Sequence, residues 1–349
     1  MPKIAQIFSA AAAVIAAALS APGAAAQSAA EFYRNRQINM VVGSDAGGGF
    51  DLYARLLSRH MGRHLPEGAR FVVQNMPGAG SVTMSNALTN NMPKDGAFIG
   101  APQSSMIVER LLHLVSPGGK AANFDVARLN WLGTMTQDVF AVFGWHGKPI
   151  QGVDGLRKAT YSMGVSGPNT DGYLIGSIMN TLLGTKIKII TGYKGPAEEL
   201  IAMERGEIDV APMAFSAAIT LRPTLLEDKK FPIMLQMGAR LHPELPDVPS
   251  LYSLVSSADD RAALALIFDK YQLGRPYFVA ADVPAERVAM LRKAFDAALA
   301  DKELRAEAAK LKAEIDPLDG ASVQGLIEKM YAQPEALVKR ARMFLGKDS

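Results

Sequence analysis

A strand that runs into three consecutive glycines and then into a helix constrains this chain more than any other stretch. Residues 38–42 are apolar, Gly47–Gly49 follow them, and Asp51 opens a segment in which Leu and Arg recur at helical spacing. Glycines let the backbone approach a bound group, and the first turn of a helix leaves N–H groups unpaired, so such a turn attracts anions. The alternative is a structural turn in which Asp51 only caps the helix.

Two more turns of the same kind follow in the first half of the chain. The expected strands 70–74 and 97–101 each run into small or polar residues, at 75–81 and 102–105, and then into a helix. This alternation predicts a parallel sheet with helices on its faces. Because the carboxyl ends of parallel strands lie at one edge of the sheet, all three turns are expected to face one cleft.

The second half of the chain repeats this logic. After one extended segment expected at 131–145, strands alternate again with helices, and small-residue turns at 166–172 and 191–196 precede two of these helices. The sequence therefore predicts a second α/β unit. The strands expected from here to the C-terminus are 161–165, 186–190, 208–213, 232–237 and 276–280.

The C-terminal helices indicate how the two halves are connected. The helices after Pro284 have no glycine-loop strands of their own, so they are expected to pack back on the first half. The chain would then cross twice between two α/β lobes, near 134–138 and 273–277, and two crossings make a hinge. The expected limits are 27–137 and 276–349 for lobe 1 and 138–275 for lobe 2.

The first 26 residues have the pattern of a cleaved secretory signal peptide. Lys3 supplies the positive charge, residues 4–19 an apolar run, and Ala24–Ala26 a small-residue cleavage site. An uncleaved membrane anchor is the alternative, although the run is short for a membrane span. The pattern predicts export to the periplasm.

Charge and cysteine content exclude several classes of function. Removal of residues 1–26 takes away one of the 37 basic residues and none of the 34 acidic ones, so the expected mature chain is nearly balanced and shows no sign of nucleic-acid binding. The chain has no cysteine, which excludes disulfides, thiolate metal sites and a cysteine nucleophile.

Catalytic and cofactor motifs are incomplete in this sequence. The serine elbow fails at Ser166, no P-loop lysine follows Gly49, and the three glycines lack the spacing of a dinucleotide fingerprint. His60 and His64 have metal-ligand spacing but no third ligand nearby. No catalytic residue, metal or cofactor is therefore expected. What remains is a neutral set of N–H, hydroxyl and amide donors without a fixed cation, which suits a carboxylate.

Seven motifs, taken together, resemble one family of binding proteins. They follow the chain in this order: Val42–Gly43 to Asp51–Arg55, Gln74–Gly80, Pro93–Gly96, Tyr193–Gly195, Gly206–Asp209, Leu245–Leu251 and Val283–Pro284. The set is similar to the tripartite tricarboxylate transporter receptors, the Bug-like (TctC-like) extracytoplasmic solute-binding proteins. The resemblance implies a type II periplasmic-binding-protein fold, a carboxylate in the interlobe cleft, and delivery to a permease with one large and one small membrane subunit.

The donor set and the resemblance together imply which residues bind the ligand. Two residues depart from the family's pattern: Asp45 would repel an anion if it faced inward, and Phe50 stands where a small polar residue is usual. The expected ligand-binding residues are Ser44, Gly47, Gly48, Gly49, Asp51, Asn75, Gly78, Ala79, Gly80, Gln103, Ser104, Ser105, Ser166, Asn169, Thr170, Asp171, Tyr193 and Gly195.

The sequence thus predicts a monomeric periplasmic receptor that closes its lobes around a small organic acid and performs no chemistry on it. One alternative is an exported enzyme that acts on a small carboxylate in the same cleft. Another is a ligand-sensing receptor for a sensor kinase. The sequence does not specify which carboxylate is bound.

Overall fold

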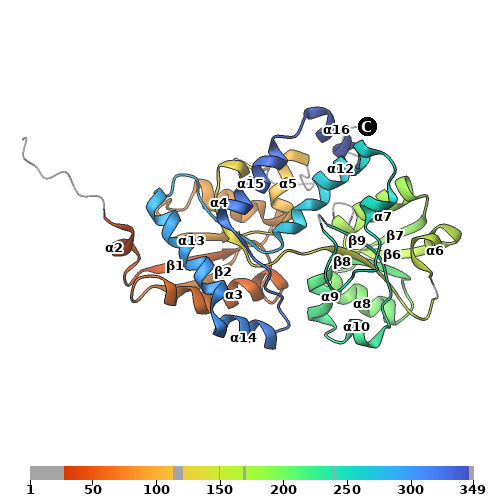
Figure 1. Cartoon of the computed structure of the whole chain (residues 1–349), viewed down its shortest axis with the longest axis horizontal. Coiled ribbons are helices and arrows are strands. Elements are labelled where there is room, and N and C mark those ends of the chain that lie inside the picture. The colour runs from red at the N-terminus through yellow and green to blue at the C-terminus, as the bar shows by residue number, and fades with distance from the viewer. Residues whose placement is uncertain (1–26, 113–120, 149, 168–169, 239, 346–349) are drawn as a thin grey trace, which may run out of the picture.

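The computed structural model describes residues 27–112, 121–148, 150–167, 170–238 and 240–345. It contains two α/β lobes that lie side by side, each built on one sheet (Figure 1). The expected signal peptide and Asn169 lie outside the described residues. Within the described part, no helix is long and apolar enough to cross a membrane.

Lobe 1 is built on a six-stranded sheet in the order β11-β4-β10-β3-β1-β2. Strand β1 pairs in parallel with β2 and β3, whereas β10 is antiparallel to both β3 and β4. The strands are β1 (Gln37–Val42), β2 (Arg70–Asn75), β3 (Phe98–Ala101), β4 (Asn130–Thr134), β10 (Pro276–Val279) and β11 (Leu318–Asp319).

Lobe 2 is built on a five-stranded sheet in the order β7-β6-β8-β5-β9. Strand β6 is parallel to β7 and β8, and β5 is antiparallel to β8 and β9. The strands are β5 (Phe140–Gly144), β6 (Thr160–Val165), β7 (Lys186–Thr191), β8 (Val210–Ala214) and β9 (Ile233–Met237).

The strands expected to pair in parallel, β1, β2 and β3, do so, but both sheets also contain antiparallel strands that the sequence did not predict. If the lobe's own strands are numbered along the chain, each sheet has the order second, first, third, inserted, fourth, and in lobe 1 a fifth strand, β11, follows at the edge. The inserted strand, β10 or β5, is the one that enters from the other lobe, and it runs antiparallel to its neighbours. For the same reason the segment expected as one extended stretch at 131–145 is two strands, β4 and β5, in different sheets.

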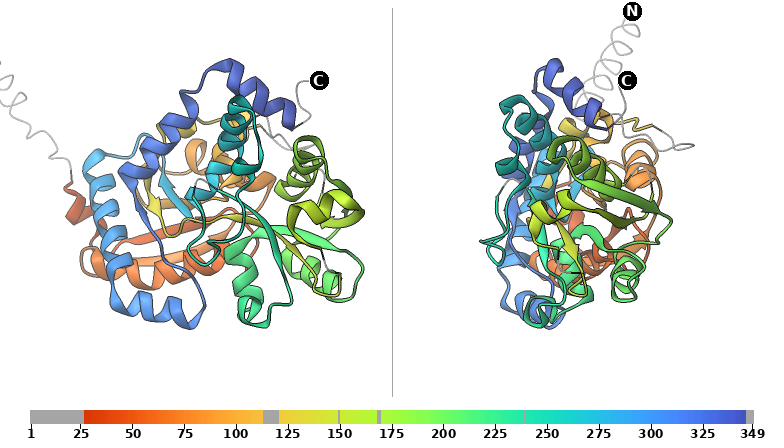
Figure 2. Two further views of the ribbon diagram at one scale, coloured as in Figure 1. Left: turned by 45° about the vertical axis from the view of Figure 1, so that its right-hand side comes forward. Right: turned by 90° about the vertical axis from the view of Figure 1, so that its right-hand side faces the viewer.

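Helices cover the faces of both sheets (Figures 1 and 2). The C-terminal helices α13 and α15 pack against β4, and α13 also packs on α3, so they return to lobe 1 as expected. Lobe 1 carries α2 (Ala29–Tyr33), α3 (Gly49–Met61), η1 (Gly62–His64), η2 (Ala79–Ser81), α4 (Val82–Asn90), α5 (Ser105–Leu112), η3 (Val126–Arg128), α13 (Ala285–Ala300), α14 (Lys302–Lys310) and α15 (Gly320–Tyr331). Lobe 2 carries α6 (Gly152–Lys158), α7 (Asp171–Leu183), α8 (Pro196–Glu204), α9 (Phe215–Leu221) and α10 (Leu225–Asp228).

A third group of helices lies over the junction of the lobes (Figure 1). The last helix, α16, packs along α12 and also contacts α5 of lobe 1 and α7 of lobe 2. These helices were not anticipated from the sequence. They are α11 (Leu251–Leu254), α12 (Ala258–Phe268), η4 (Asp269–Leu273) and α16 (Glu335–Phe344).

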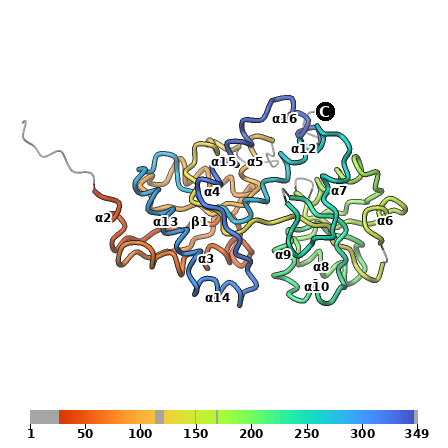
Figure 3. Tube along the Cα trace, in the orientation of Figure 1, coloured from red at the N-terminus to blue at the C-terminus, as the bar shows by residue number. Residues whose placement is uncertain are grey.

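The two segments that connect the lobes run side by side (Figure 3). Backbone hydrogen bonds join Met135 N–H to the carbonyl of Arg275 (3.0 Å) and Gly274 N–H to the carbonyl of Thr136 (3.0 Å). Asp138 N–H bonds to the carbonyl of Tyr271 at 2.8 Å. The paired segments form the expected hinge, while the limits of each lobe remain a prediction.

Candidate functional site

A cavity of about 1010 Å³ lies between the lobes, beside the connecting segments. Four α-helices and one 3-10 helix begin on its wall, because each follows a strand whose carboxyl end faces the cavity. Their first residues all line it: Gly49 of α3, Ala79 of η2, Ser105 of α5, Asp171 of α7 and Pro196 of α8. Unpaired N–H groups and positive helix ends from both lobes thus converge on one space.

The first glycine loop is held in shape by the side chain of Asp51. This carboxylate is buried and accepts hydrogen bonds from Gly47 N–H (2.9 Å), Asn75 Nδ2 (2.9 Å) and Arg55 Nε (2.9 Å). Burial alone would raise the pKa of Asp51, but these hydrogen bonds outweigh it and the pKa is lowered. Asp51 is not the N-cap of α3, because Gly48 holds that position. The carboxylate of Asp51 is instead bound by Gly47, Asn75 and Arg55, so it stabilises the loop.

Ser81 joins the three turns of lobe 1. Its fully buried hydroxyl donates to the carbonyl of Gly43 (2.9 Å) and accepts from Gln103 N–H (2.9 Å). A Cβ atom at Gly43 would lie 2.3 Å from this oxygen, so the first turn needs glycine there. Ala79 and Ser81 both have positive φ values, 47° and 78°, a conformation that a non-glycine residue adopts only when its surroundings enforce it. The turns therefore form one rigid wall.

Arg275 is the cation beside the first loop. It lines the cavity, is 7% exposed, and its Nη2 lies 3.3 Å from where a Cβ of Gly49 would be. Its guanidinium lies over the rings of Phe50 (4.5 Å) and Tyr53 (5.0 Å). Two of its nitrogens donate, to the carbonyl of Gly274 and the hydroxyl of Ser216. The buried Nε–H has no acceptor among the described residues, so it can donate to a bound anion.

Lys270 connects the hinge to lobe 2. Its side chain is only 1% exposed, and Nζ donates to Asp171 Oδ1 at 2.5 Å, at the start of α7. Both residues line the cavity. Lys270 stands just before the second connecting segment, and Asp171 belongs to lobe 2. The ion pair therefore links the hinge region to lobe 2 and helps to fix the position of that lobe.

Three further carboxyl groups lie on the cavity wall. Asp138 is buried in the first connecting segment, where it accepts from the hydroxyl and N–H of Ser216. Glu199 of α8 is also buried, and burial, helped by the nearby charge of Glu198, raises its pKa to about 7 against the opposing effect of a weak hydrogen bond from Ser166. Burial also raises the pKa of Glu109 in α5. The wall thus carries both signs of charge, and the expected neutral donor set without a cation is wrong.

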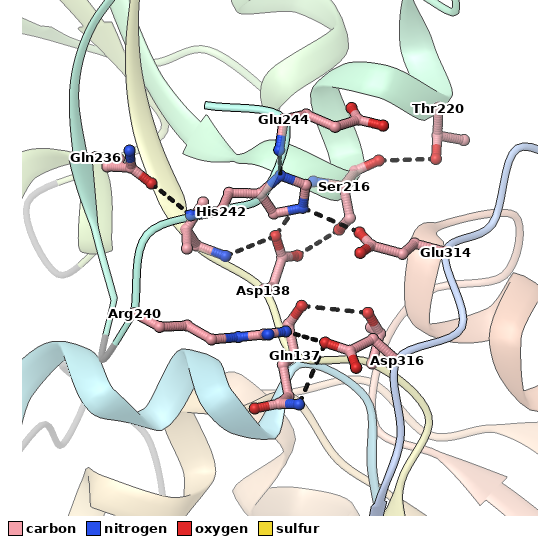
Figure 4. A network of polar contacts seen from close by, with 12 residues as sticks. Gln137, Asp138, Ser216, Thr220, Gln236, Arg240, His242, Glu244, Glu314 and Asp316 are labelled. Atoms are coloured by element: carbon pink, nitrogen blue, oxygen red, sulfur yellow. Dashed lines mark hydrogen bonds and ion pairs between the residues drawn. The ribbon is translucent and has the colours of Figure 1, made fainter. Parts of the chain in front are cut away.

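A second contact between the lobes lies outside the cavity (Figure 4). The loop after β9 places His242 3.3 Å from Glu314 and pairs Arg240 with Asp316. Asp316 also accepts from Gln137 of the first connecting segment at 3.2 Å. The backbone N–H of His242 donates to the side-chain oxygen Oε1 of Gln236 at 2.9 Å, which holds His242 in place. These contacts join lobe 2 to the lobe 1 segment that precedes β11.

The structure brings only part of the predicted set to the cavity. The predicted residues on its wall are Gly49, Ala79, Gly80, Gln103, Ser104, Ser105, Ser166, Thr170 and Asp171. The predicted residues that do not line it are Ser44, Gly47, Gly48, Asp51, Asn75, Gly78, Tyr193 and Gly195. Tyr193 packs against Gly164 and the core of lobe 2 and does not line the cavity in this structure. Of the two departures, Asp45 is exposed away from the cavity and Phe50 lines it.

Apart from Asp171, the charged residues of the site were missed by sequence reasoning. Lys270, Arg275, Asp138 and Glu199 have no motif around them, and they lie up to 137 positions apart. The only signal was indirect: Asp138 and Arg275 fall within, or directly beside, the two stretches predicted to cross between the lobes. Charged residues in a hinge beside a predicted cleft are candidates for ligand contact.

Comparisons with known proteins agree with this architecture. No family model matches the chain. It is 28% identical over 252 residues to a UPF0065 protein of Cupriavidus necator, across 69% of this chain and 72% of that protein. A UPF0065 protein of Bordetella bronchiseptica is 33% identical over 95 residues, which is 27% of each chain.

Solved structures of low sequence identity share the fold. A TctC solute-binding protein from Polaromonas superposes with a TM-score of 0.66 at 17% identity, covering 90% of this chain and 100% of that one. The periplasmic binding protein BugD gives 0.63 at 19%, covering 90% and 98%. An R. palustris protein in complex with adipate gives 0.62 at 21%, covering 88% and 97%.

The two mixed sheets and the paired hinge segments define a protein of the periplasmic-binding-protein fold, type II. The UPF0065 relatives and the matching folds confirm the resemblance to the Bug-like (TctC-like) family seen in the sequence.

Proposed function

We propose that this protein is a periplasmic solute-binding receptor that captures a small organic acid in the interlobe cavity. It would deliver the acid to a tripartite tricarboxylate transporter with one large and one small membrane subunit. The observation that carries the proposal is the convergence of helix starts from both lobes on one cavity beside the buried Arg275, whose Nε has no acceptor within the described part of the chain.

A carboxylate is the chemical group that this wall fits best. Its two oxygens accept several hydrogen bonds, and bonds to a charged acceptor are about twice as strong as neutral ones. The available donors are backbone N–H groups at Gly49 and Gly80, the side chains of Gln103 and Ser105, and Arg275 Nε. The pKa of Glu199, raised to about 7, keeps this carboxyl partly neutral and reduces its repulsion of an anion, and burial shifts the pKa of Glu109 in the same direction.

Binding would close the lobes around the hinge. A ligand that contacts both walls favours the closed arrangement by the difference in its affinity for the two states. The proposal includes no catalysis, in keeping with fold neighbours that are described as binding proteins. Turnover of a carboxylate by the purified protein would instead support an exported enzyme.

The proposal is tested by a thermal-shift screen of the protein without residues 1–26 against organic acids, followed by calorimetry. A ligand at one hundred times its Kd adds about 2.7 kcal/mol to the free energy of unfolding, which a melting curve resolves. A screen in which no mono- or dicarboxylate raises the Tm contradicts the proposal.

Two neighbouring glycines give a matched pair of variants. A Cβ at Gly49 would lie 3.3 Å from Arg275 Nη2, whereas one at Gly48 would meet only the carbonyl of Asp45 at 3.6 Å. We expect Gly49→Val to weaken acid binding by at least about tenfold, and Gly48→Val by less than about threefold, since losing a hydrogen bond from a charged donor costs about 1.5 kcal/mol or more. Equal losses in both variants would place the ligand elsewhere on the loop.

A further inference from the structure

We propose that the acid captured here carries an apolar tail, which lies at the far end of the cavity between α5, α7, α12 and α16. This inference rests on the proposed function and specifies the class of ligand. The cavity has two chemically different ends. Donors gather at the hinge end, around Ser105 and Arg275, and aliphatic or aromatic side chains line the other end: Leu112, Leu174, Ile267, Met343, Phe344 and Leu345.

Helix α5 shows how far apart the two ends lie. Ser105 is its first residue and Leu112 its last, and both line the cavity. Seven residues at a rise of about 1.5 Å place these positions roughly 10 Å apart. Helix α7 lines the cavity along its first two turns in the same way, from Asp171 to Ser177. The space is therefore elongated, with a polar and an apolar end.

The volume also exceeds what a short diacid needs. Ligand sites for small molecules typically measure roughly 300–1,000 Å³, and this cavity of about 1010 Å³ lies at the upper limit of that range. A four- to six-carbon diacid would leave the apolar end filled with water, which is unfavourable beside aliphatic side chains. An alkyl or aryl tail would fill it.

The C-terminal helix α16 supplies much of the apolar end. It packs along α12 and reaches α5 and α7, so its last residues complete the wall between the lobes. Met343 on this helix is 60% exposed, and Phe344 and Leu345 are half-buried. Apolar side chains left partly open beside a cavity are the surface that an apolar ligand group covers.

Glu109 lies on α5 between Ser105 and Leu112, the residues that mark the two ends. It is buried, a backbone hydrogen bond from Ala122 reaches its carboxyl, and burial raises its pKa. The burial that disfavours the charged form of Glu109 also disfavours a second carboxylate of the ligand beside it, whereas an alkyl chain carries no such cost. A monocarboxylate with a tail therefore suits this space better than a diacid of equal length.

The test is a series of straight-chain monocarboxylates measured by calorimetry on the protein without residues 1–26. From butanoate to octanoate we expect affinity to rise about fourfold for each methylene that is buried. Hexanoate should bind at least about tenfold more tightly than adipate, which has the same number of carbons. Affinity that does not change with length, or adipate binding as tightly as hexanoate, would overturn the inference.

Variants of the apolar end make the test specific. Leu174→Gln and Phe344→Gln are expected to remove most of the gain between butanoate and octanoate while butanoate affinity stays within about twofold. Leu311→Gln, on an exposed leucine outside the cavity, is the matched control and should keep the full length dependence. Phe344 is half-buried at a helix end, so this variant should fold even if Leu174→Gln does not.

The outcomes separate this inference from the proposed function. If diacids bind and affinity does not rise with the length of an apolar tail, the inference is wrong, but the proposed function as an organic-acid receptor is unaffected. Failure of every acid to bind would contradict both.

Discussion

The two lobes share one strand order but present different chemistry to the cavity. In lobe 1 the three turns offer glycines, amides and hydroxyls, and no charged side chain of these turns reaches the cavity. Lobe 2 presents the carboxylates of Asp171 and Glu199. The cations come from neither set of turns, because Lys270 and Arg275 belong to the hinge region.

This difference shows what the repeated architecture contributes. The strand order places helix starts at the same edge of each sheet, so both lobes bring N–H groups to the cavity. Positive charge is added by residues outside the repeat, Lys270 and Arg275, where the chain passes from one lobe to the other. The proposed recognition of an acid and the proposed closure at the hinge therefore involve the same residues.

The largest expected effect comes from removing the hinge cation beside lobe 1. Arg275→Gln should weaken the binding of organic acids at least about 100-fold, because a buried charge-assisted donor is lost and Asp138 keeps its charge nearby. Calorimetry measures the loss. Circular dichroism checks the fold, and Arg36→Gln, which changes an exposed arginine far from the cavity, serves as control. Unchanged affinity would mean that the turns of lobe 1 bind without help from the hinge.

A smaller effect is expected from the ion pair to lobe 2. Lys270→Met keeps the volume of the side chain and leaves Asp171 partly solvated, and we expect about tenfold weaker binding from a less favourable closed state. Asp171→Asn leaves a buried lysine unpaired and should be more destabilising, by about 3 kcal/mol or more. A double-mutant cycle isolates the coupling between the two residues. Zero coupling in affinity, with coupling in stability alone, would make the pair purely structural.

The smallest effect concerns the carboxyl group that lobe 2 contributes through Glu199. Its pKa is raised to about 7, so it is mostly neutral at pH 6 and charged at pH 8.5. Acid affinity should therefore fall about three- to fivefold as pH rises through 7, and Glu199→Gln should abolish this dependence. An affinity that rises with pH would show that Glu199 pairs with a cationic group of the ligand.

The same residue sets a pH dependence of stability without ligand. Because the pKa of Glu199 is higher in the folded than in the unfolded state, the folded protein binds this proton more tightly. The free energy of unfolding should fall as pH rises from about 4.5 to above 7, by up to about 3 kcal/mol. Urea denaturation of the wild type and Glu199→Gln at several pH values measures this contribution. If the free energies of unfolding of the wild type and Glu199→Gln change with pH in parallel, this contribution of Glu199 is contradicted.

Local patterns in the sequence predicted most of the secondary structure near the site. The strand expected at 38–42 is β1 at Gln37–Val42, and the turns expected to face one cleft do reach one cavity through Gly49, Ala79 and Ser105. These features depend on neighbouring residues, namely an apolar run, a glycine or hydroxyl turn, and a helical repeat. The binding roles of these residues remain a prediction.

Features set by long-range contacts were not predicted. The antiparallel strands β5 and β10 each lie beside strands distant in the sequence, and their direction depends on how the chain crosses between the lobes. Helix α12 and its packing on α16 were missed for the same reason. Residues such as Asn75 and Asp51 belonged to the expected loop, but only the folded loop shows that their hydrogen bonds are used within it.

The sequence by itself determined two α/β lobes, a hinge and donor-rich turns, because each of these features follows from local patterns of neighbouring residues. Only the tertiary structure decided the charges of the cavity and its apolar end. Lys270, Arg275 and Glu199 come together through folding, and α16 reaches the cavity from the end of the chain. Burial then raises the pKa of Glu199 and leaves Arg275 Nε without an acceptor in the described structure, and both effects arise only when water is excluded.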